Sequence, residues 1–548
     1  MRLWWPRLSA GAGRIRAADV AGAATPVVVA GLLFSRYAIG GNLGRDEAIY
    51  AYGGQQLTHG VAPYASIFDP KAPMATFVAG LGAGVARLLG GNDLDGIRIV
   101  FFLSACLTAL AVYLLAKRLW QSTTAGLAAA VVFASFQAFA ADALAGPDAK
   151  TPGVLFAVVS MWLCVRRQWP WAAAAGTLAF LTWQPFGIYF VVALVLAPLT
   201  AESGRRLRSL GSTAVGVAVP LAVVSLYFAV AGAFGKFIEA AVVFPVVGVH
   251  RAPESVPARI DRILHIISAD YHVSGLLLEI GLVLLLALAV VHVVLHRNDI
   301  RRALLHPLVS VVLVTGLLQI AYAFTDFQGG PDVFPFLPYG ALGLGGTVAL
   351  VLTRVRARLP RQLVAGTVVA SLVTLTALSW TWFTDAAALD KEPLRMQRTE
   401  ACAIAWMLGP QGGLYAIGDP TPLVLLRRRN PDRFIYLGSG VLDWKLDHVQ
   451  DRFAGWVAQI IAAHPQVIVM STFASRPMSH ALVRAGYNVG YDGKWRVFVT
   501  PQALDRGMAH GVTLTPEATP YAANFYGVML PASGCSQSQR ADEKGRVA

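Results

Sequence analysis

The chain contains little charge for its length. Of its 548 residues only 14% are charged, whereas 56% are hydrophobic and the mean hydropathy is +0.56. An ordinary globular domain is about 25% charged, so this composition excludes a soluble enzyme of this size. The long apolar runs and the 10% of aromatic residues also exclude a disordered chain. The sequence therefore predicts a membrane protein, in which the net charge of +14 marks orientation and implies no nucleic-acid partner.

Cysteine is scarce as well. Four cysteines are too few and too scattered for a disulfide framework, and Cys106 and Cys164 lie in apolar runs. Cys402 and Cys535 lie far apart near the C-terminus. Two explanations fit them equally: they pair if this region is extracytoplasmic, or they are two free thiols.

Signatures of a bound metal or nucleotide are absent. His59 and His250 have no second ligand at a spacing typical of metal sites. Gly418-Asp419-Pro420 has the pattern of a turn and lacks a glycine-rich phosphate loop. The sequence predicts no metal and no cofactor, while a dependence on a divalent metal stays open.

Long apolar segments dominate what is present. A membrane-spanning helix needs about 17 to 25 apolar residues. Two apolar segments, 72–91 and 170–198, do not fit this rule simply. The run near the N-terminus follows several arginines and, at roughly 20 residues, is too long for a secretory signal, so we expect a retained helix. The segments that fit are 17–36, 97–116, 125–143, 147–165, 209–232, 273–295, 304–324, 335–353 and 363–383.

Basic clusters orient these segments, because Lys and Arg collect on the cytoplasmic side. If all of the basic clusters lie on the cytoplasmic side, the chain must cross the membrane an even number of times between one cluster and the next. Segment 72–91 then lies along the outer face, and 170–198 turns back at Thr182-Trp183-Gln184-Pro185, where Pro185 removes a backbone donor. The result is eleven spans with the N-terminus cytoplasmic and the C-terminus extracytoplasmic. The clusters are the N-terminal arginines, 117–118, 166–167, 205–208, 297–302 and 354–361.

The domain organisation follows from a change of pattern near residue 384. Residues 1–384 are expected to form an all-α polytopic membrane domain. Residues 385–530 alternate helical patterns with short β-rich runs, which indicates a small extracytoplasmic α/β domain. Residues 531–548 are too polar to bury a core and are expected to be disordered. The β-rich runs are 414–417, 434–437, 466–470 and 495–499.

The first outer loop, residues 37–96, contains a long motif. It reads DExxYxxxGxxLxxGxxPY from Asp46 and continues five residues later with Asp69-Pro70-Lys71-Ala72-Pro73. Helical spacing over 46–58 places Asp46 and Tyr50 on one face, so Asp46 projects from the start of a surface helix. The alternative is an acid that only stabilises the helix N-terminus through the dipole.

This loop resembles that of the GT-C class of membrane glycosyltransferases, specifically the bacterial relatives of protein O-mannosyltransferases and lipid A aminoarabinose transferases. The resemblance covers residues 15–350 in layout and 45–73 in motif. The chain departs from the family at Ala72, where a first proline is usual, and at Trp183-Gln184-Pro185. The implied fold is a GT-C-like bundle of about 11 transmembrane helices.

The resemblance implies a reaction in which an acceptor hydroxyl displaces the phosphate of a polyprenyl-phosphate sugar, with inversion. A carboxylate must take the hydroxyl proton, and the resemblance assigns this role to Asp46, with Glu47 as a supporting acid. The leaving phosphate needs a fixed cation. Lys71 is the best candidate, since lysine is rare here; the alternative is a lysine that only snorkels to the interface.

Further candidates are less specific. Asp142 and Asp148 are possible supporting acids; Asp148 matches a second functional acid of the aminoarabinose transferases, or it caps the helix after it. In the class, loops like 233–272 cover the donor, so Arg251 and Arg259 are candidate phosphate ligands, or a solvated basic face. The expected substrate-binding residues are Tyr50, Tyr64, Gln184 and the intramembrane Glu279.

The sequence favours a glycosyltransferase of the cytoplasmic membrane with a mannose- or arabinose-like sugar, acting in cell-envelope glycan or glycoprotein synthesis. Its partners would be the lipid-linked donor, a glycan, lipid or protein acceptor, and membrane lipids. The alternatives are a transporter or lipid-linked-sugar flippase, and an inactive sugar-binding scaffold. A transporter more often has repeated halves and polar breaks near the bilayer midplane.

Overall fold

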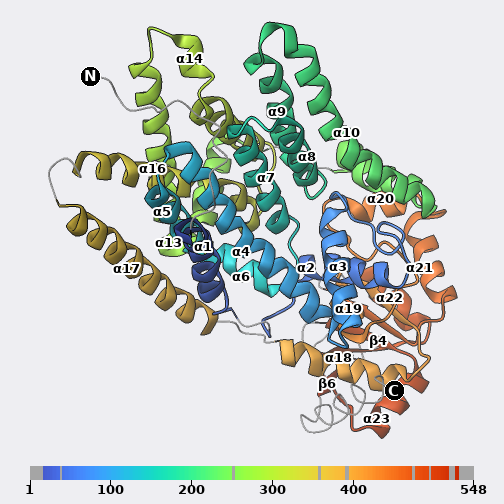
Figure 1. Ribbon diagram of the computed structural model, residues 1–548. Coiled ribbons are helices and arrows are strands. Elements are labelled where there is room, and N and C mark those ends of the chain that lie inside the picture. The colour runs from blue at the N-terminus through green and yellow to red at the C-terminus, as the bar shows by residue number, and fades with distance from the viewer. Residues whose placement is uncertain are drawn as a thin grey trace.

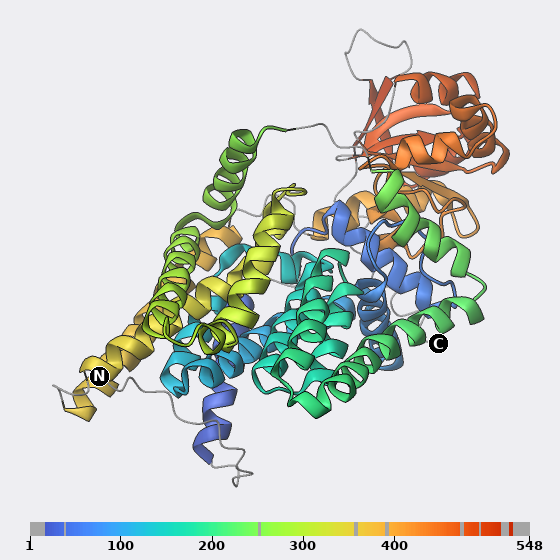
Figure 2. The ribbon, with the colours of Figure 1, turned by 90° about the horizontal axis from the view of Figure 1, so that it is seen from above.

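The computed structural model describes residues 17–37, 40–249, 254–355, 360–388, 394–471, 476–492, 495–516 and 525–529. Long helices form one part of the molecule and a small sheet with its own helices forms the other (Figure 1). The two parts lie side by side, with the helices that follow the N-terminal span between them (Figures 1 and 2).

Apolar helices form the larger part. Five of them are long and apolar enough to cross a membrane, and six shorter apolar helices accompany them among the described residues. A multi-pass membrane protein is therefore confirmed, whereas the total of eleven spans stays a prediction. The helices are α1 (Ala17–Phe34), α4 (Asp93–Trp120), α5 (Thr123–Ala134), α6 (Gln137–Ala145), α7 (Lys150–Val165), α8 (Trp169–Phe180), α9 (Gly187–Thr200), α10 (Arg206–Val230), α13 (Val256–Leu295), α15 (Val314–Ala323), α16 (Leu337–Val355) and α17 (Arg361–Ala388).

Short elements connect these helices. Positive φ at His272 breaks α13 into two parts. Most of the other connecting elements are a single turn, and they lie at the ends of the apolar helices. They are η1 (Gln184–Phe186), η2 (Ser203–Arg205), α11 (Phe234–Ile238), η3 (Glu239–Val243), α12 (Phe244–Val247), α14 (Ile300–Leu304), η4 (Leu308–Leu313) and η5 (Gly330–Phe336).

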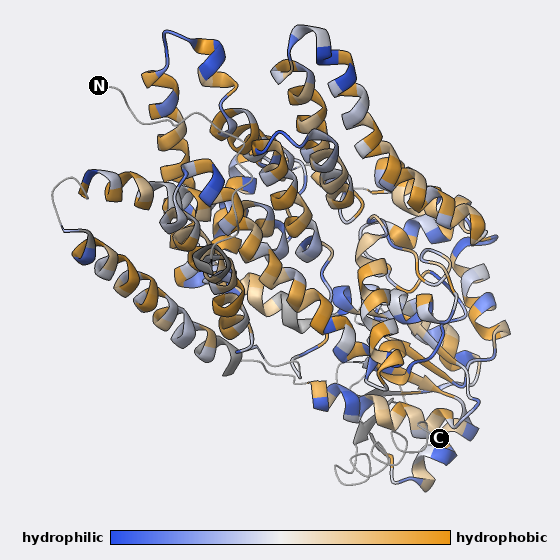
Figure 3. Ribbon diagram, viewed as in Figure 1, coloured by the Kyte–Doolittle hydropathy of each residue, from blue (hydrophilic) through white to orange (hydrophobic). Residues whose placement is uncertain are grey.

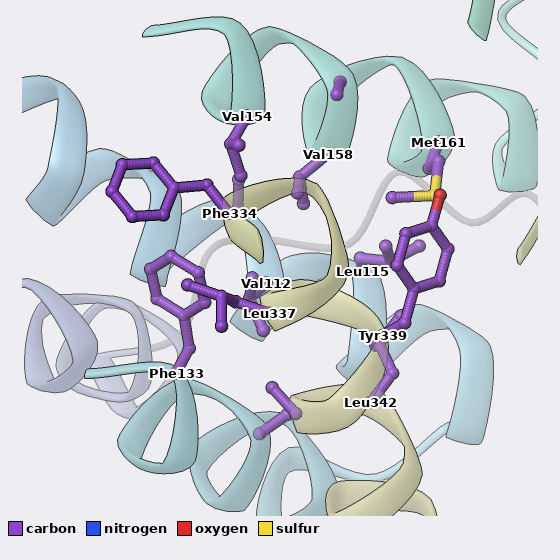
Figure 4. Close-up of a cluster of buried hydrophobic side chains, with 14 of the residues drawn as sticks. Val112, Leu115, Phe133, Val154, Val158, Met161, Phe334, Leu337, Tyr339 and Leu342 are labelled. Carbon is purple, nitrogen blue, oxygen red and sulfur yellow. The ribbon is translucent and has the colours of Figure 1, made fainter. Parts of the chain in front are cut away.

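The bundle has an apolar core and an apolar outer surface. Side chains of α4, α5, α7, η5 and α16 pack together and exclude water (Figure 4). In this core the Tyr339 hydroxyl donates to Thr315 Oγ1 at 2.8 Å, which satisfies a buried polar group. Along α10, apolar residues such as Val219, Val223 and Leu226 are exposed, and Figure 3 shows hydrophobic residues along the outer helices. A soluble protein rarely exposes so much apolar surface, whereas a lipid bilayer covers it.

The predicted hairpin over 170–198 is confirmed. α8 ends at Phe180, η1 contains Pro185 and α9 begins at Gly187, so the chain reverses at the predicted break. A Cβ on Gly176 would lie 2.6 Å from the backbone nitrogen of Phe190, so this glycine permits close packing of the two arms.

The first outer loop, residues 37–96, contains two helices, α2 (Arg45–Thr58) and α3 (Met74–Leu88). They pack on each other so tightly that a Cβ on Gly54 would lie 2.8 Å from the backbone of Gly80. α3 also packs on α4, and its Leu81 and Leu88 remain exposed. This apolar strip is what a helix lying on a bilayer surface would present.

The C-terminal part contains a mixed six-stranded sheet of order β1-β2-β4-β3-β6-β5. β1 pairs parallel with β2 and β3 with β6, and the remaining pairs are antiparallel. The small α/β region is thereby confirmed, while its boundaries at 385 and 530 stay predictions and 531–548 lie outside the described residues. The strands are β1 (Leu414–Ile417), β2 (Val467–Met470), β3 (Asn488–Asp492), β4 (Trp495–Val499), β5 (Thr513–Pro516) and β6 (Phe525–Met529).

One predicted strand is wrong. Residues 434–437 form an irregular segment, because the backbone next to them bonds to other parts of the chain. The Arg433 carbonyl accepts from Phe68 of the first outer loop, and the Ile435 carbonyl accepts from Gly418. The helices of this region are α18 (Leu394–Leu408), α19 (Thr421–Leu426), α20 (Val441–Asp447), α21 (Arg452–Ala462), α22 (Arg476–Arg484) and α23 (Pro501–Ala509).

The described cysteines are in two different states. Cys106 and Cys164 are buried free thiols, whereas Cys402 in α18 is disulfide-bonded. Cys535, the other member of the predicted pair, lies outside the described residues.

Candidate active site

The candidate site begins at the first turn of α2. Gly44 is the N-cap, and Asp46 and Glu47 follow where the helix dipole stabilises anions. Successive helical residues point about 100° apart, so the two carboxyl groups have different surroundings. The Asp46 side chain is 49% exposed, and its Oδ1 lies 3.2 Å from Arg45 Nε.

Glu47 is partly buried and faces the loop after α6. A Cβ on Gly146 would lie 2.5 Å from the Glu47 Cβ, so this glycine lets the loop approach α2 closely. Desolvation raises the pKa of Glu47 to about 7, and the neighbouring Asp148 and Asp46 add to the rise, although a backbone hydrogen bond and Lys71 oppose it. Asp46 and Glu47 thus form an acid pair in which Glu47 retains its proton up to near neutral pH.

Lys71 lies at the end of a tightly bonded loop. Its backbone N–H donates to Asp69 Oδ1 at 3.0 Å, and its carbonyl accepts from the Tyr64 hydroxyl at 2.8 Å. The Lys71 ammonium lies 5.5 Å from the ring centroid of Tyr50. Burial opposes its charge, but Tyr50, Asp148, Asp69 and Asp46 outweigh burial and hold the pKa of Lys71 above its usual range. The group remains a cation.

Tyr50 and Asp69 complete the surroundings of Lys71. Burial raises the pKa of Asp69 to about 6, opposed mainly by Lys71. Burial, with the nearby Asp69, also holds the pKa of Tyr50 above its usual range. Within the described residues the buried Tyr50 hydroxyl has no hydrogen-bond partner of good geometry, although Lys71 is close enough to oppose the rise of its pKa.

Asp148 acts on the site from the loop before α7. Its Oδ1 accepts from the backbone N–H of Lys150 at 2.7 Å, but the N-cap of α7 is Ala149, so Asp148 is not the helix cap that the sequence offered as an alternative. The same carboxylate influences Glu47, Tyr50 and Lys71, which is compatible with a role at the site.

Sequence reasoning overlooked a buried ion pair next to Asp148. Lys150 Nζ lies 2.9 Å from Asp332 Oδ1 and 4.9 Å from the ring centroid of Trp183. Asp332 lies in η5, far along the chain, so no local pattern indicates the pair.

The other predicted residues are placed differently. The Gln184 Nε2 group donates to the carbonyls of Pro70 at 2.8 Å and Ala241 at 3.1 Å, so it joins backbone segments. Arg259 Nε pairs with Glu254 at 3.0 Å and also bonds to the Phe324 carbonyl. Both side chains are thus engaged by groups other than the Lys71 ammonium, and Glu279 is exposed on α13. Asp142 lies in α6 with its side chain undescribed, and Arg251 lies outside the described residues.

Within the part of the chain that the structure describes, no three His, Cys, Asp or Glu side chains form a group suited to a metal ion. What the site does combine is a half-exposed carboxylate, a partly buried cation and a buried tyrosine hydroxyl. Such an arrangement can take a proton from one ligand group and neutralise an anion on another.

Comparison with known proteins agrees with this chemistry. Residues 70–228 match the family described as dolichyl-phosphate-mannose-protein mannosyltransferase. Among curated proteins, the undecaprenyl phosphate-alpha-4-amino-4-deoxy-L-arabinose arabinosyl transferase of Pseudomonas paraeruginosa is 32% identical over 143 residues. That match covers 24% of this chain and 26% of the relative, about a quarter of the length of each.

Solved structures share the fold of most of this chain. The crystal structure of ArnT from Cupriavidus metallidurans in the apo state superposes with a TM-score of 0.60 at 18% identity, covering 88% of this chain and 98% of that one. The chain is related to the GT-C glycosyltransferases. Its resemblance to this class, predicted from the loop motif, is confirmed. The same ArnT bound to undecaprenyl phosphate matches with a TM-score of 0.57 at 17% identity, covering 87% and 97% of the two chains.

Proposed function

We propose that this protein is an inverting glycosyltransferase that moves a mannose- or arabinose-like sugar from a polyprenyl phosphate to an acceptor hydroxyl. The reaction would take place on the outer face of the cytoplasmic membrane, in the synthesis of cell-envelope glycans or glycoproteins. The observation that carries the proposal is the partly buried Lys71 cation beside Tyr50, with the Asp46 carboxylate close enough to act on its charge.

Each group has a role in the transfer. The acceptor oxygen forms a bond to the anomeric carbon while the bond from that carbon to the phosphate oxygen breaks. The electron pair leaves with the phosphate, where Lys71 neutralises the charge that develops. The acceptor proton passes to the Asp46 carboxylate, a role worth about 10²–10⁴ in rate. Glu47 supports Asp46 without adding a second full negative charge, because its pKa is about 7.

Two observations support the outer face. Clustered Lys and Arg at one end of the apolar segments favour a location of α2, α3 and the sheet region on the opposite, extracytoplasmic side. The disulfide at Cys402 in the sheet region is typical of an oxidising compartment. The likeness to glycosyltransferases favours this function over a transporter or flippase.

The test is sugar transfer in proteoliposomes, with radiolabelled mannose or aminoarabinose on undecaprenyl phosphate as donor. Asp46→Asn should lower kcat by about 10²-fold or more, since it removes the proton acceptor. Lys71→Ala should raise the donor KM. Asp95→Asn is the matched control, because Asp95 lies in the first turn of α4 and is 3.9 Å from Arg398. Unchanged transfer by Asp46→Asn would contradict the assignment of the base.

A further inference from the structure

The segment that ends in Lys71 is held by residues from three distant parts of the chain. Phe68 is fully buried, stacked on Phe434 at a centroid distance of 4.9 Å and packed edge-on against Phe244 at 5.2 Å. Two residues later, the Pro70 carbonyl accepts from Gln184. Lys71 therefore follows a backbone that has little freedom to shift.

Arg433, from the sheet region, makes most of the polar contacts to this segment. Its carbonyl accepts from the Phe68 N–H at 2.7 Å, and its guanidinium donates to the Tyr64 carbonyl at 3.4 Å. The guanidinium carbon also lies 5.4 Å from the ring centroid of Phe68 and 4.8 Å from that of Phe434. One side chain thus contacts both ends of the turn before Lys71.

The same guanidinium fixes a second segment. Arg433 donates to Glu239 Oε2 at 2.6 Å, and Trp444 Nε1 donates to Glu239 Oε1 at 3.1 Å. Although burial opposes the charge of Glu239, these two hydrogen bonds hold its pKa below its usual range. Both carboxylate oxygens are therefore satisfied, and the start of η3 is tied to the sheet region. Figure 2 shows the green segment that contains η3 passing next to the orange sheet region.

Gln184 closes the connection. Its amide group donates to Pro70, next to Lys71, and to Ala241, in the same turn as Glu239. The contacts therefore form a ring from Arg433 through Glu239, η3 and Gln184 back to the backbone before Lys71.

We propose that Arg433 is a positioning residue for Lys71, through which the C-terminal region determines how tightly the lipid phosphate is bound. The inference rests on the proposed function. A cation stabilises a bound phosphate best when it is already in place, since no free energy is then lost in ordering it. Arg433 suits this role because its planar group stacks on aromatic rings while donating in two directions, which lysine cannot reproduce.

The experiment measures binding of undecaprenyl phosphate to the full-length protein in nanodiscs, together with steady-state transfer. Arg433→Ala should weaken binding about tenfold, equivalent to about 1.4 kcal/mol, and raise the donor KM by a similar factor with kcat little changed. Arg433→Lys should recover only part of this affinity. Arg428→Ala is the control, because Arg428 belongs to the same region but bonds to the carbonyls of Gly409 and Pro410.

A double-mutant cycle separates positioning from general destabilisation. If Arg433 acts through Lys71, adding Arg433→Ala to Lys71→Ala should cost much less than it costs the wild type. Full additivity, or wild-type binding by Arg433→Ala, would overturn the inference while leaving Lys71 in its role. If instead Lys71→Ala binds undecaprenyl phosphate as the wild type does, the proposed phosphate site fails, and the role of Arg433 fails with it.

Discussion

At the scale of single residues, neighbouring acids in one motif have different surroundings. Asp46 is half-exposed beside Arg45, whereas Glu47, one position later, packs against the loop at Gly146. Desolvation raises the pKa of Glu47 to about 7. Helical geometry alone explains why only one of them can face a ligand above the first turn of α2.

The raised pKa of Glu47 has a consequence for stability. Between its ordinary pKa of 4.5 and about 7, the folded protein retains a proton on Glu47 that the unfolded chain has lost. The contribution of Glu47 to the free energy of unfolding is therefore greatest below pH 4.5 and falls as the pH rises toward 7. Glu47→Gln should flatten this fall.

Thermal unfolding in detergent between about pH 4.5 and 8 checks the prediction. The difference in Tm between Glu47→Gln and the wild type should grow in favour of the variant as the pH rises. Glu202→Gln serves as control, because the Glu202 side chain is 80% exposed. Parallel Tm curves for wild type and Glu47→Gln would show that the burial of Glu47 does not cost stability.

At the scale of elements, local chemistry predicted most of the arrangement. Pro185 predicted the break between α8 and α9, whereas the inference from the basic clusters that 72–91 does not cross the membrane stays a prediction. The spacing of the loop motif likewise predicted α2. The strand predicted at residues 434–437 is wrong, because a run of apolar and aromatic residues does not reveal that it packs on another loop.

The candidate site was predictable only in part, for a physical reason. Asp46, Glu47 and Lys71 belong to one motif, so their spacing carries a signal. Arg433 and Glu239 lie 194 residues apart and become neighbours only when the sheet region packs on the segment that contains η3. No periodicity in a single sequence encodes such a contact.

The position of α3 outside the membrane core can be tested directly. Because α3 is predicted to lie along the outer face, single cysteines at His59 before it and at Gly91 after it should both react with an impermeant thiol reagent added outside intact cells. Both positions are exposed. A cysteine at Gly204, where no atom lies within 4 Å of an added Cβ, should react only after the cells are opened. Labelling of 59 and 91 from opposite sides would show that α3 crosses the membrane.

At the scale of the whole molecule, the first outer loop and the C-terminal region pack into a common hydrophobic core. The Tyr52 hydroxyl accepts from the Asn430 N–H at 2.9 Å, and Gln55 Nε2 donates to the Val424 carbonyl at 3.2 Å. One hydrophobic cluster also runs from α2 and α3 into the helices and strands of the sheet region. The sheet region therefore covers one side of the candidate site and is more than an appended module.

Because the two parts share a core, we expect a substitution at their interface to lower the thermal stability of both. Tyr52→Phe removes the acceptor for a buried N–H, which should cost about 1–3 kcal/mol because the group loses its partner without regaining water. Tyr227→Phe on α10 is the control, since its ring packs on Phe77 and Phe228 and these contacts are retained in the variant. The measurement is thermal unfolding, monitored in parallel by tryptophan fluorescence and by loss of undecaprenyl phosphate binding.

Because the α2 helix has Asp46 at its start and Tyr52 less than two turns later, both signals should shift together to lower temperature in Tyr52→Phe. If the fluorescence transition moves and binding keeps its wild-type midpoint, the two parts are energetically independent despite their common core.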